Sequence, residues 1–139
     1  MIKSLDGGHG ELITPPLAGT ILPGVVRQSC LDLARHWGEL KVSERPISLS
    51  EVRHLCLSGR MLECFCTGTA AAIAPVRGFC IDDQRLSVPL DPDDPFSQIG
   101  PYAKKLYDAL LEIYSGLCVD YPRTIDGQWA TIIPSLPTE

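Results

Sequence analysis

Residues 10–27 read GELITPPLAGTILPGVVR, an order that indicates an extended segment, a loop and the start of a helix. A Pro-Gly pair ends the extended structure just before Val25. From there apolar residues recur with the spacing of one helix face, at Val25, Cys30, Leu31, Leu33, Ala34 and Trp37. We predict a helix over residues 25–37 that ends at Gly38. Its first backbone N–H groups have no partner within the helix, so they can hold a phosphate without a cationic side chain.

The composition limits the number of domains and the classes of partner that the chain can bind. The chain has 139 residues, 45% of them hydrophobic, which suffices for one domain with a core. A net charge of -5 gives no general attraction to nucleic acid or to anionic membranes. The sequence contains neither an apolar run long enough for a membrane span nor a signal-peptide pattern at residue 1. We expect a soluble, intracellular protein, with cytoplasmic and mitochondrial locations equally open.

The order of elements predicts a mixed α/β (α+β) domain. Glycines in the turn 6–10, between Ile2 and Leu12, indicate a β-hairpin. Ser48 and Glu51 form an S-x-x-E capping box for a second helix that ends near Gly59. The other expected elements are strands over 40–44, 61–67 and 72–76, a ribbon over 79–88, a loop over 90–95, and a helix over 102–114 with Leu106, Ala109, Leu110 and Ile113 on its core face.

Cysteine spacing gives no metal site. The six cysteines lack CxxC pairs and accompanying histidines, and they are Cys30, Cys56, Cys64, Cys66, Cys80 and Cys118. We expect most of them to be buried, reduced thiols. Cys64 and Cys66 are two apart on the predicted strand 61–67 and would share a face, where a disulfide would be strained.

The other polar residues have structural explanations that we prefer to catalytic ones. We expect all four lysines to be solvated surface residues, namely Lys3, Lys41, Lys104 and Lys105. We expect a solvated charge pattern at Arg27, Arg35, Glu39, Lys41, Glu44 and Arg45. We assign no catalytic role to His9, His36 and His54, and we expect Trp129 to bury its ring at the domain surface.

An ordered set of segments resembles the branched-chain amino acid aminotransferases of the class IV pyridoxal-phosphate family. These segments are residues 10–45, residues 62–70 (LECFCTGTA), residues 74–76, residues 100–116 and residues 128–132 (QWATI). The resemblance implies a fold type IV pyridoxal-phosphate enzyme, and it covers only the C-terminal part of such an enzyme. It therefore implies a single partial domain over 1–139, built as an incomplete strand-rich pseudobarrel with helices.

The resemblance also implies site residues. For the cofactor, pyridoxal phosphate, it implies that the backbone N–H groups of Val25 and Val26, which follow Gly24, bind the phosphate. It also implies that the Thr69 hydroxyl binds the same phosphate and that Leu22 packs against the ring. It implies that Thr69 and Ala70 present N–H groups to the substrate carboxylate. The family usually has threonine where Val26 stands, so one side-chain hydrogen bond is lost. Some members have a redox CxxC where this chain has Ala71 and Ala74, which implies that this regulation is absent.

The family's Schiff-base lysine, and its arginine, tyrosine and glutamate at the cofactor, lie upstream of the part that this chain resembles. The resemblance therefore implies amino transfer between Leu, Ile or Val and 2-oxoglutarate in intact relatives, and a truncated chain without catalytic residues that is inactive alone. A shortened gene model, a broken gene and a chain that works beside an upstream polypeptide all remain open, as does homodimerisation or pairing with a full-length relative. Two other functions stay open: a non-transaminating binding or regulatory pseudoenzyme, and an aminotransferase-like enzyme of a specialised amino acid-derived pathway.

Overall fold

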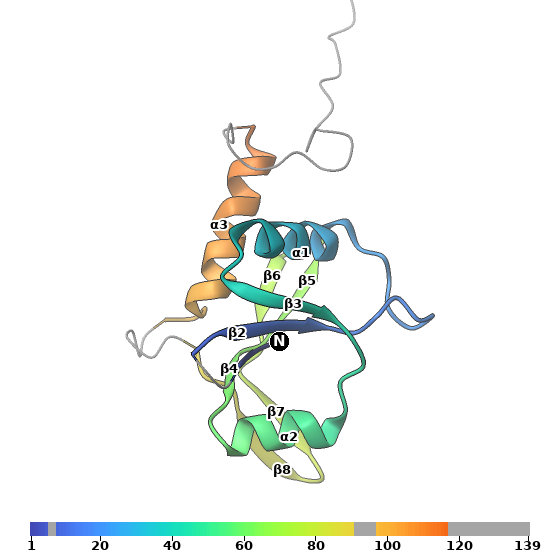
Figure 1. The fold of residues 1–139 in the computed structure, drawn as a ribbon, viewed down its shortest axis with the longest axis vertical. Helices are drawn as coiled ribbons and strands as arrows, with labels where there is room; N and C mark the ends of the chain where they lie inside the picture. The colour runs from blue at the N-terminus through green and yellow to red at the C-terminus, as the bar shows by residue number, and fades with distance from the viewer. Residues whose placement is uncertain (6–7, 91–96, 117–139) are drawn as a thin grey trace, which may run out of the picture.

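A four-stranded mixed sheet with a helix on either side forms the centre of the structure. The computed structural model describes residues 1–5, 8–90 and 97–116. In the order β3-β2-β1-β4, the sheet consists of β1 (Ile2–Ser4), β2 (Gly10–Thr14), β3 (Leu40–Glu44) and β4 (Met61–Glu63). Figure 1 shows α1 (Val25–Trp37) on one side of this sheet, α2 (Leu49–Leu57) on the other and α3 (Pro101–Tyr114) alongside α1. A mixed α/β fold, as predicted, is observed.

The strands β2 and β3 are parallel, whereas the other neighbours in the sheet are antiparallel. The parallel register runs from Gly10 opposite Leu40 to Thr14 opposite Glu44. The predicted hairpin is confirmed, because β1 pairs antiparallel with β2 and places Ile2 opposite Leu12. Parallel neighbours need a crossover connection, and α1 supplies it between β2 and β3. The helix consequently begins at the carboxyl edge of these two strands.

Local sequence signals set the ends of the first two helices. The predicted bounds of α1 are confirmed, and Gly38 follows it with φ 67°, a left-handed conformation that glycine adopts without strain. At the start of α2 the Ser48 hydroxyl accepts a hydrogen bond from the Glu51 N–H at 3.1 Å. This hydrogen bond is one of the two that make up the predicted capping box. The Glu51 carboxylate instead binds Arg45 and Lys3, so it takes part in a tertiary contact.

The expected strand 61–67 is wrong, because the chain changes sheet in its middle. It leaves the four-stranded sheet after Glu63 and resumes at Phe65 as β5, with Cys64 between the two strands. The Cys64 carbonyl accepts a hydrogen bond from Val76 at 2.8 Å, which starts a separate ribbon. That ribbon pairs β5 (Phe65–Gly68) with β6 (Ala72–Pro75), and the predicted ribbon 79–88 is observed as β7 (Gly78–Ile81) with β8 (Gln84–Ser87).

The cysteine expectation holds only in part. Five cysteines are free in the part of the chain that the structure describes, but only Cys30 is buried, while Cys66 and Cys80 are exposed. Burial raises the pKa of the Cys30 thiol to about 12, so this thiol stays protonated at neutral pH. Cys64 lies between two strands, so Cys64 and Cys66 do not belong to one strand and the predicted shared face is wrong.

The helix α1 is buried on two faces, which fixes it between the sheet and α3. One face contributes Leu31 and Ala34 to a cluster with the sheet residues Ile2 and Leu12. The other face packs with α3 and β6 in a cluster of Val26, Cys30, Leu33, Ile73, Ala103, Leu106, Ala109, Leu110 and Ile113. The predicted core face of the last helix is thus confirmed. Within residues 1–5, 8–90 and 97–116, no helix is long and apolar enough to cross a membrane.

A buried carboxylate caps α3. Glu63 is 3% exposed, and its two carboxylate oxygens accept hydrogen bonds from the N–H groups of Tyr102 at 2.8 Å and Ala103 at 2.9 Å. The helix offers no side-chain cap of its own, since its N-cap is Gly100. A Cβ atom at position 100 would lie 2.3 Å from the Glu63 Cδ atom, so any residue other than glycine would displace the capping carboxylate. The end of β4 and the start of α3 are thereby joined.

Three expectations concern residues outside the described part. These are the buried ring of Trp129, the resemblance over residues 128–132 and a buried thiol at Cys118. Most of the expected loop 90–95 and two residues of the turn 6–10 also lie outside it.

We predict that Glu63→Gln lowers the free energy of unfolding by about 1–3 kcal/mol, because an amide nitrogen cannot accept the second N–H bond and leaves that group buried and unpaired. Urea denaturation measures this. The matched control is Glu112→Gln on the exposed face of α3, which should change stability by about 0.5 kcal/mol or less. Equal losses in the two variants would contradict the capping role.

Candidate functional site

The start of α1 combines several features of an anion-binding helix terminus. Its N-cap, Gly24, is extended at φ -68° and ψ 134° and makes no side-chain capping bond, and the first turn contains no acidic residue. The first bond within the helix runs from Gln28 N–H to the Gly24 carbonyl at 3.0 Å, so the N–H groups of residues 25–27 have no helical acceptor. These uncapped groups at the positive end of the dipole suit a phosphate or carboxylate.

The apolar residues around this helix start differ sharply in exposure. Leu22 is 84% exposed and Val25 is 78% exposed. The Val26 side chain, in contrast, is only 6% exposed and packs in the cluster that contains Ile73. Leu22 is therefore free to cover a flat ring, whereas Val26 can offer a ligand only its backbone N–H group. A hollow of about 360 Å³ lies beside the helix start, lined by Leu17, Pro23, Gly24, Val25, Arg27, Gln28, Ser29 and Asp32.

Thr69 and Ala70 lie in the exposed turn that joins β5 to β6. Gly68 pairs with Ala72 across the ribbon, so only residues 69–71 form the turn. Neither Thr69 nor Ala70 lines the hollow at the start of α1. The turn and the helix start border the same apolar cluster, because Val26 and Ile73 both belong to it, and Figure 1 shows the β5–β6 ribbon running up to α1.

The start of α1, uncapped and free of acidic residues, fits a phosphate group, and the Thr69 hydroxyl lies on the exposed β5–β6 turn. We call the N–H groups of Val25 and Val26, together with the Thr69 hydroxyl, the candidate phosphate site.

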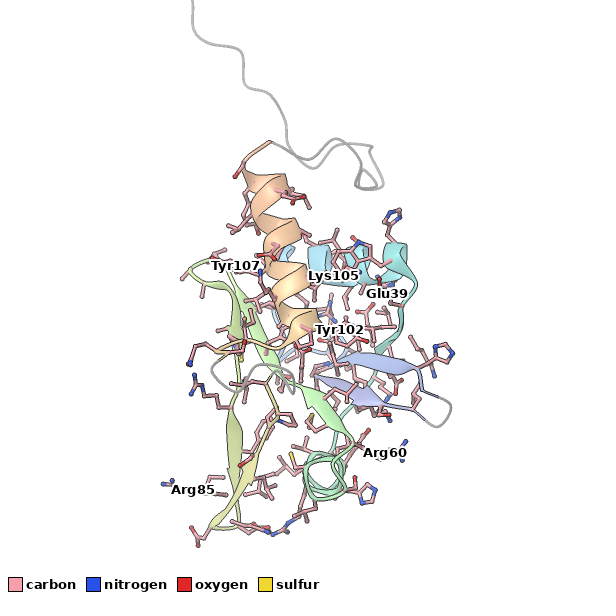
Figure 2. All side chains as sticks on the ribbon, turned by 90° about the vertical axis from the view of Figure 1, so that its left-hand side faces the viewer. Glu39, Arg60, Arg85, Tyr102, Lys105 and Tyr107 are labelled. Carbon is pink, nitrogen blue, oxygen red and sulfur yellow. The ribbon has the colours of Figure 1, made fainter. Side chains whose placement is uncertain are left out.

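All four lysines of the sequence lie in the described part, and each has an anionic partner. On α3, Lys104 binds Asp108 and Lys105 binds Glu39, the latter pair seen in Figure 2. Lys41 is 67% exposed, as expected for a surface lysine. The expectation is wrong for Lys3, whose side chain is only 17% exposed because it lies between Glu11 at 3.1 Å and Glu51 at 3.6 Å.

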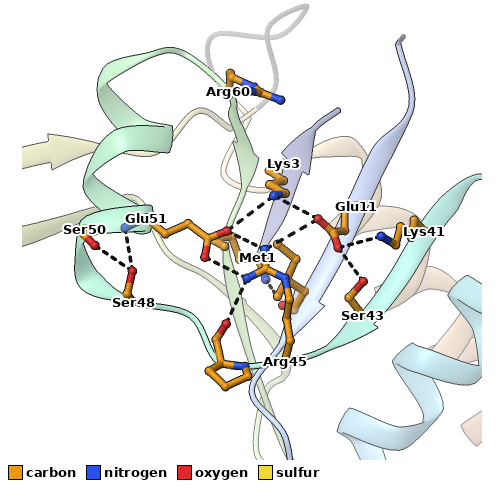
Figure 3. Close-up of polar contacts among 12 residues, drawn as sticks. Met1, Lys3, Glu11, Lys41, Ser43, Arg45, Ser48, Ser50, Glu51 and Arg60 are labelled. Atoms are coloured by element: carbon orange, nitrogen blue, oxygen red, sulfur yellow. Dashed lines mark hydrogen bonds and ion pairs between the residues drawn. The ribbon is translucent and has the colours of Figure 1, made fainter. Parts of the chain in front are cut away.

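Figure 3 shows the buried charge cluster around Lys3, on the sheet face toward α2. Glu11 is its central carboxylate, with a side chain 5% exposed. Burial alone would raise the pKa of Glu11, but the Ser43 hydroxyl at 2.6 Å and the Lys3 ammonium outweigh burial, so the pKa is lowered. Arg45 likewise lowers the pKa of Glu51 by direct hydrogen bonding. Both carboxylates of the cluster are thus paired with cations of the chain, which indicates a structural role.

Arg27 departs furthest from the solvated position that its sequence context predicts. It is 8% exposed rather than solvated. One guanidinium nitrogen, Nη2, donates to the Pro15 carbonyl at 2.9 Å and to Glu44 Oε2 at 2.8 Å. These partners lie 12 and 17 positions away, so local spacing carried no signal for them. The histidines His9, His36 and His54 are exposed, and no three potential metal ligands come together within the residues that the structure describes.

Comparison with known proteins defines the class. The family model for amino-transferase class IV matches residues 7–79, which is just over half of the chain. This segment contains the βαβ unit, the start of α1 and the turn with Thr69. The chain therefore belongs to the class IV aminotransferase family.

Within that family its relatives are branched-chain-amino-acid aminotransferases. The chain is 38% identical to that of Monosiga brevicollis over 92% of its own length and 30% of the relative's. It is 39% identical to that of Dictyostelium discoideum over 91% and 31%, and 48% identical to the mitochondrial enzyme of Mus musculus over 60% and 21%. The structure matches that of the Escherichia coli branched-chain amino acid aminotransferase with a TM-score of 0.56 and 29% identity, covering 86% of this chain and 33% of that one. The matched part thus spans between about a fifth and a third of the length of these relatives.

We predict that acid destabilises the protein through its buried carboxylates. The folded-state pKa of Glu11 lies below its ordinary value of 4.5, so the stability that Glu11 contributes is complete above that value and is lost as the pH falls below it. Glu11→Gln should cost about 1–3 kcal/mol at pH 7 and flatten the decline in acid. Urea titrations between pH 3 and 7, with Glu112→Gln as the control, measure both effects. A Glu11→Gln curve parallel to that of the unmodified chain would refute this.

Proposed function

We propose that this chain carries the phosphate-binding and carboxylate-binding part of a branched-chain aminotransferase site. In this proposal the N–H groups of Val25 and Val26 and the Thr69 hydroxyl bind the phosphate of pyridoxal phosphate, with Leu22 against the ring. The N–H groups of Thr69 and Ala70 bind the carboxylate of a branched-chain amino acid or of its 2-oxo acid. The single observation that supports this most is the uncapped, acid-free start of α1 at the carboxyl edge of two parallel strands.

The reaction proposed for the whole site is amino transfer between Leu, Ile or Val and 2-oxoglutarate. Pyridoxal phosphate supplies an electron sink for this chemistry when it is bound. The residues of this chain bind and orient: neutral donors hold the phosphate, and small residues at the 69–71 turn let a carboxylate approach the backbone. Proton transfer at the reacting carbon needs a basic group, and the four lysines are all engaged with carboxylates away from the start of α1. We infer that the chain of 139 residues binds the phosphate group and does not transaminate by itself.

A second candidate function is binding without turnover, as in a regulatory protein or a partner of a full-length relative. The buried Val26 favours it, because a side chain in the core cannot add the hydroxyl contact that threonine gives in the family. Exposed apolar side chains that a partner or a second copy could cover also favour it, and these include Leu22, Val25, Leu111 and Tyr114. We infer that the sheet and ribbons are part of a pseudobarrel in a single partial domain, and that the protein works inside the cell.

We predict that the chain binds pyridoxamine 5′-phosphate, which carries the phosphate and ring but forms no covalent bond with lysine. Thr69→Val should weaken this binding about fivefold by removing one hydrogen bond to the phosphate, whereas Val26→Thr should not strengthen it, because the side chain at position 26 lies in the core. Isothermal titration calorimetry measures the affinities. The matched control is Thr67→Val, two residues earlier on β5 and on the wall of a different cavity. Equal weakening by Thr67→Val and Thr69→Val would count against the proposed contact.

Borohydride treatment with pyridoxal phosphate tests the catalytic part. We expect no single lysine to be labelled stoichiometrically in the intact chain, as read by mass spectrometry of its peptides. Stoichiometric labelling at one lysine would show that the chain holds its own catalytic amine and would overturn the proposal of binding without turnover.

A further inference from the structure

Arg27 stands in the first turn of α1 and contacts two other segments at their ends. The Pro15 carbonyl opens the loop 15–24 that leads into the helix, and Glu44 is the last residue of β3. Thr14, the last residue of β2, pairs with Glu44 across the parallel register. One guanidinium therefore joins the helix start to the carboxyl edges of both parallel strands.

Glu44 extends this connection along the helix. Its Oε2 atom accepts from Arg27, and its Oε1 atom accepts from Arg35 at 2.8 Å, eight residues further along α1. A helix rises about 1.5 Å per residue, so the two arginines hold α1 at points about 12 Å apart. Two anchors on one carboxylate oppose sliding of α1 along its own axis, and such sliding would displace its first N–H groups.

The chemistry of Arg27 points to positioning rather than to packing or direct binding. Its Nε atom is buried and has no hydrogen-bond partner among the described residues. Burying this unpaired donor costs free energy, and an apolar side chain would avoid that cost. The Nη2 atom of Arg27 already donates to Glu44 and to the Pro15 carbonyl, so this nitrogen is engaged within the protein rather than by a phosphate. A guanidinium here is explained by its ability to bind two acceptors at once, which an apolar residue cannot do.

We propose that Arg27 is the positioning residue of the candidate phosphate site: by binding Pro15 and Glu44 it holds the N–H groups of Val25 and Val26 at the carboxyl edge of β2 and β3. This inference rests on the proposed function, because it concerns the same phosphate. It adds a residue that acts on the ligand only through the backbone of its neighbours.

The experiment uses Arg27→Met, which keeps much of the side-chain length and removes both hydrogen bonds. Glu44 stays paired with Arg35, and it is 34% exposed, so no buried charge is left unpaired and the variant should fold. Arg27→Lys is the conservative variant, since lysine keeps the charge and can donate from one nitrogen, but its side chain is shorter and lacks the planar guanidinium that orients Nη2. The matched stability control is Glu63→Gln, which weakens a different junction. Calorimetry with pyridoxamine 5′-phosphate gives affinity, and hydrogen exchange of peptides that cover residues 15–28 gives local order.

We expect Arg27→Met to bind pyridoxamine 5′-phosphate about tenfold more weakly, Arg27→Lys to be intermediate, and exchange to rise in residues 15–28 alone. Glu63→Gln should lose stability and keep its affinity. The inference is overturned if Arg27→Met binds as the unmodified chain does, or if affinity follows stability across all variants, although the proposed function then stands. If the unmodified chain fails to bind the probe, the proposed function fails and the inference falls with it. Should Arg27→Met not fold, Arg27→Lys decides by the same two measurements.

Discussion

Because β2 and β3 run parallel, the chain must return from the end of one strand to the beginning of the next, and α1 makes this return. The helix therefore has to begin beside the carboxyl ends of both strands. The place of the helix start follows from this constraint: its uncapped N–H groups lie in the first turn of α1, and Val26 packs in the core that α1 shares with α3 and β6. If the two strands were antiparallel, a short turn would suffice and there would be no helix start to bind an anion.

Charge is distributed unevenly about the sheet. On the face toward α2, paired carboxylates and cations are buried, with Glu11 and Glu51 held in their charged form by Lys3 and Arg45. At the start of α1 the Glu44 carboxylate is paired with Arg27, and the N–H groups beside this pair are uncapped. The charges on the sheet face toward α2 are thus paired within the protein, whereas the first N–H groups of α1 have no acceptor within the helix.

Local signals in the sequence were enough for much of the secondary structure. Gly38 ends α1 and Ser48 caps α2 through contacts with residues only a few positions away. The bounds of α1 and the cap of α2 could therefore be predicted. The break at Cys64 could not, because a hydrogen bond with Val76 and a change of partner strand cause it. Lys3 and Arg27 were misplaced on the surface for the same reason: their partners are distant in sequence. For the candidate site, the helix start was visible in the sequence, whereas the residue that holds it in place was not.

The contact between Glu63 and Gly100 has a consequence for how the sequence can diverge. A side chain at position 100 would occupy the space of the Glu63 carboxylate, and without that carboxylate the start of α3 has no cap. Neither position can change alone at low cost. A larger residue at 100 calls for a shorter acceptor at 63, so the two sites, 37 positions apart, should vary together among relatives that keep this junction between sheet and helix.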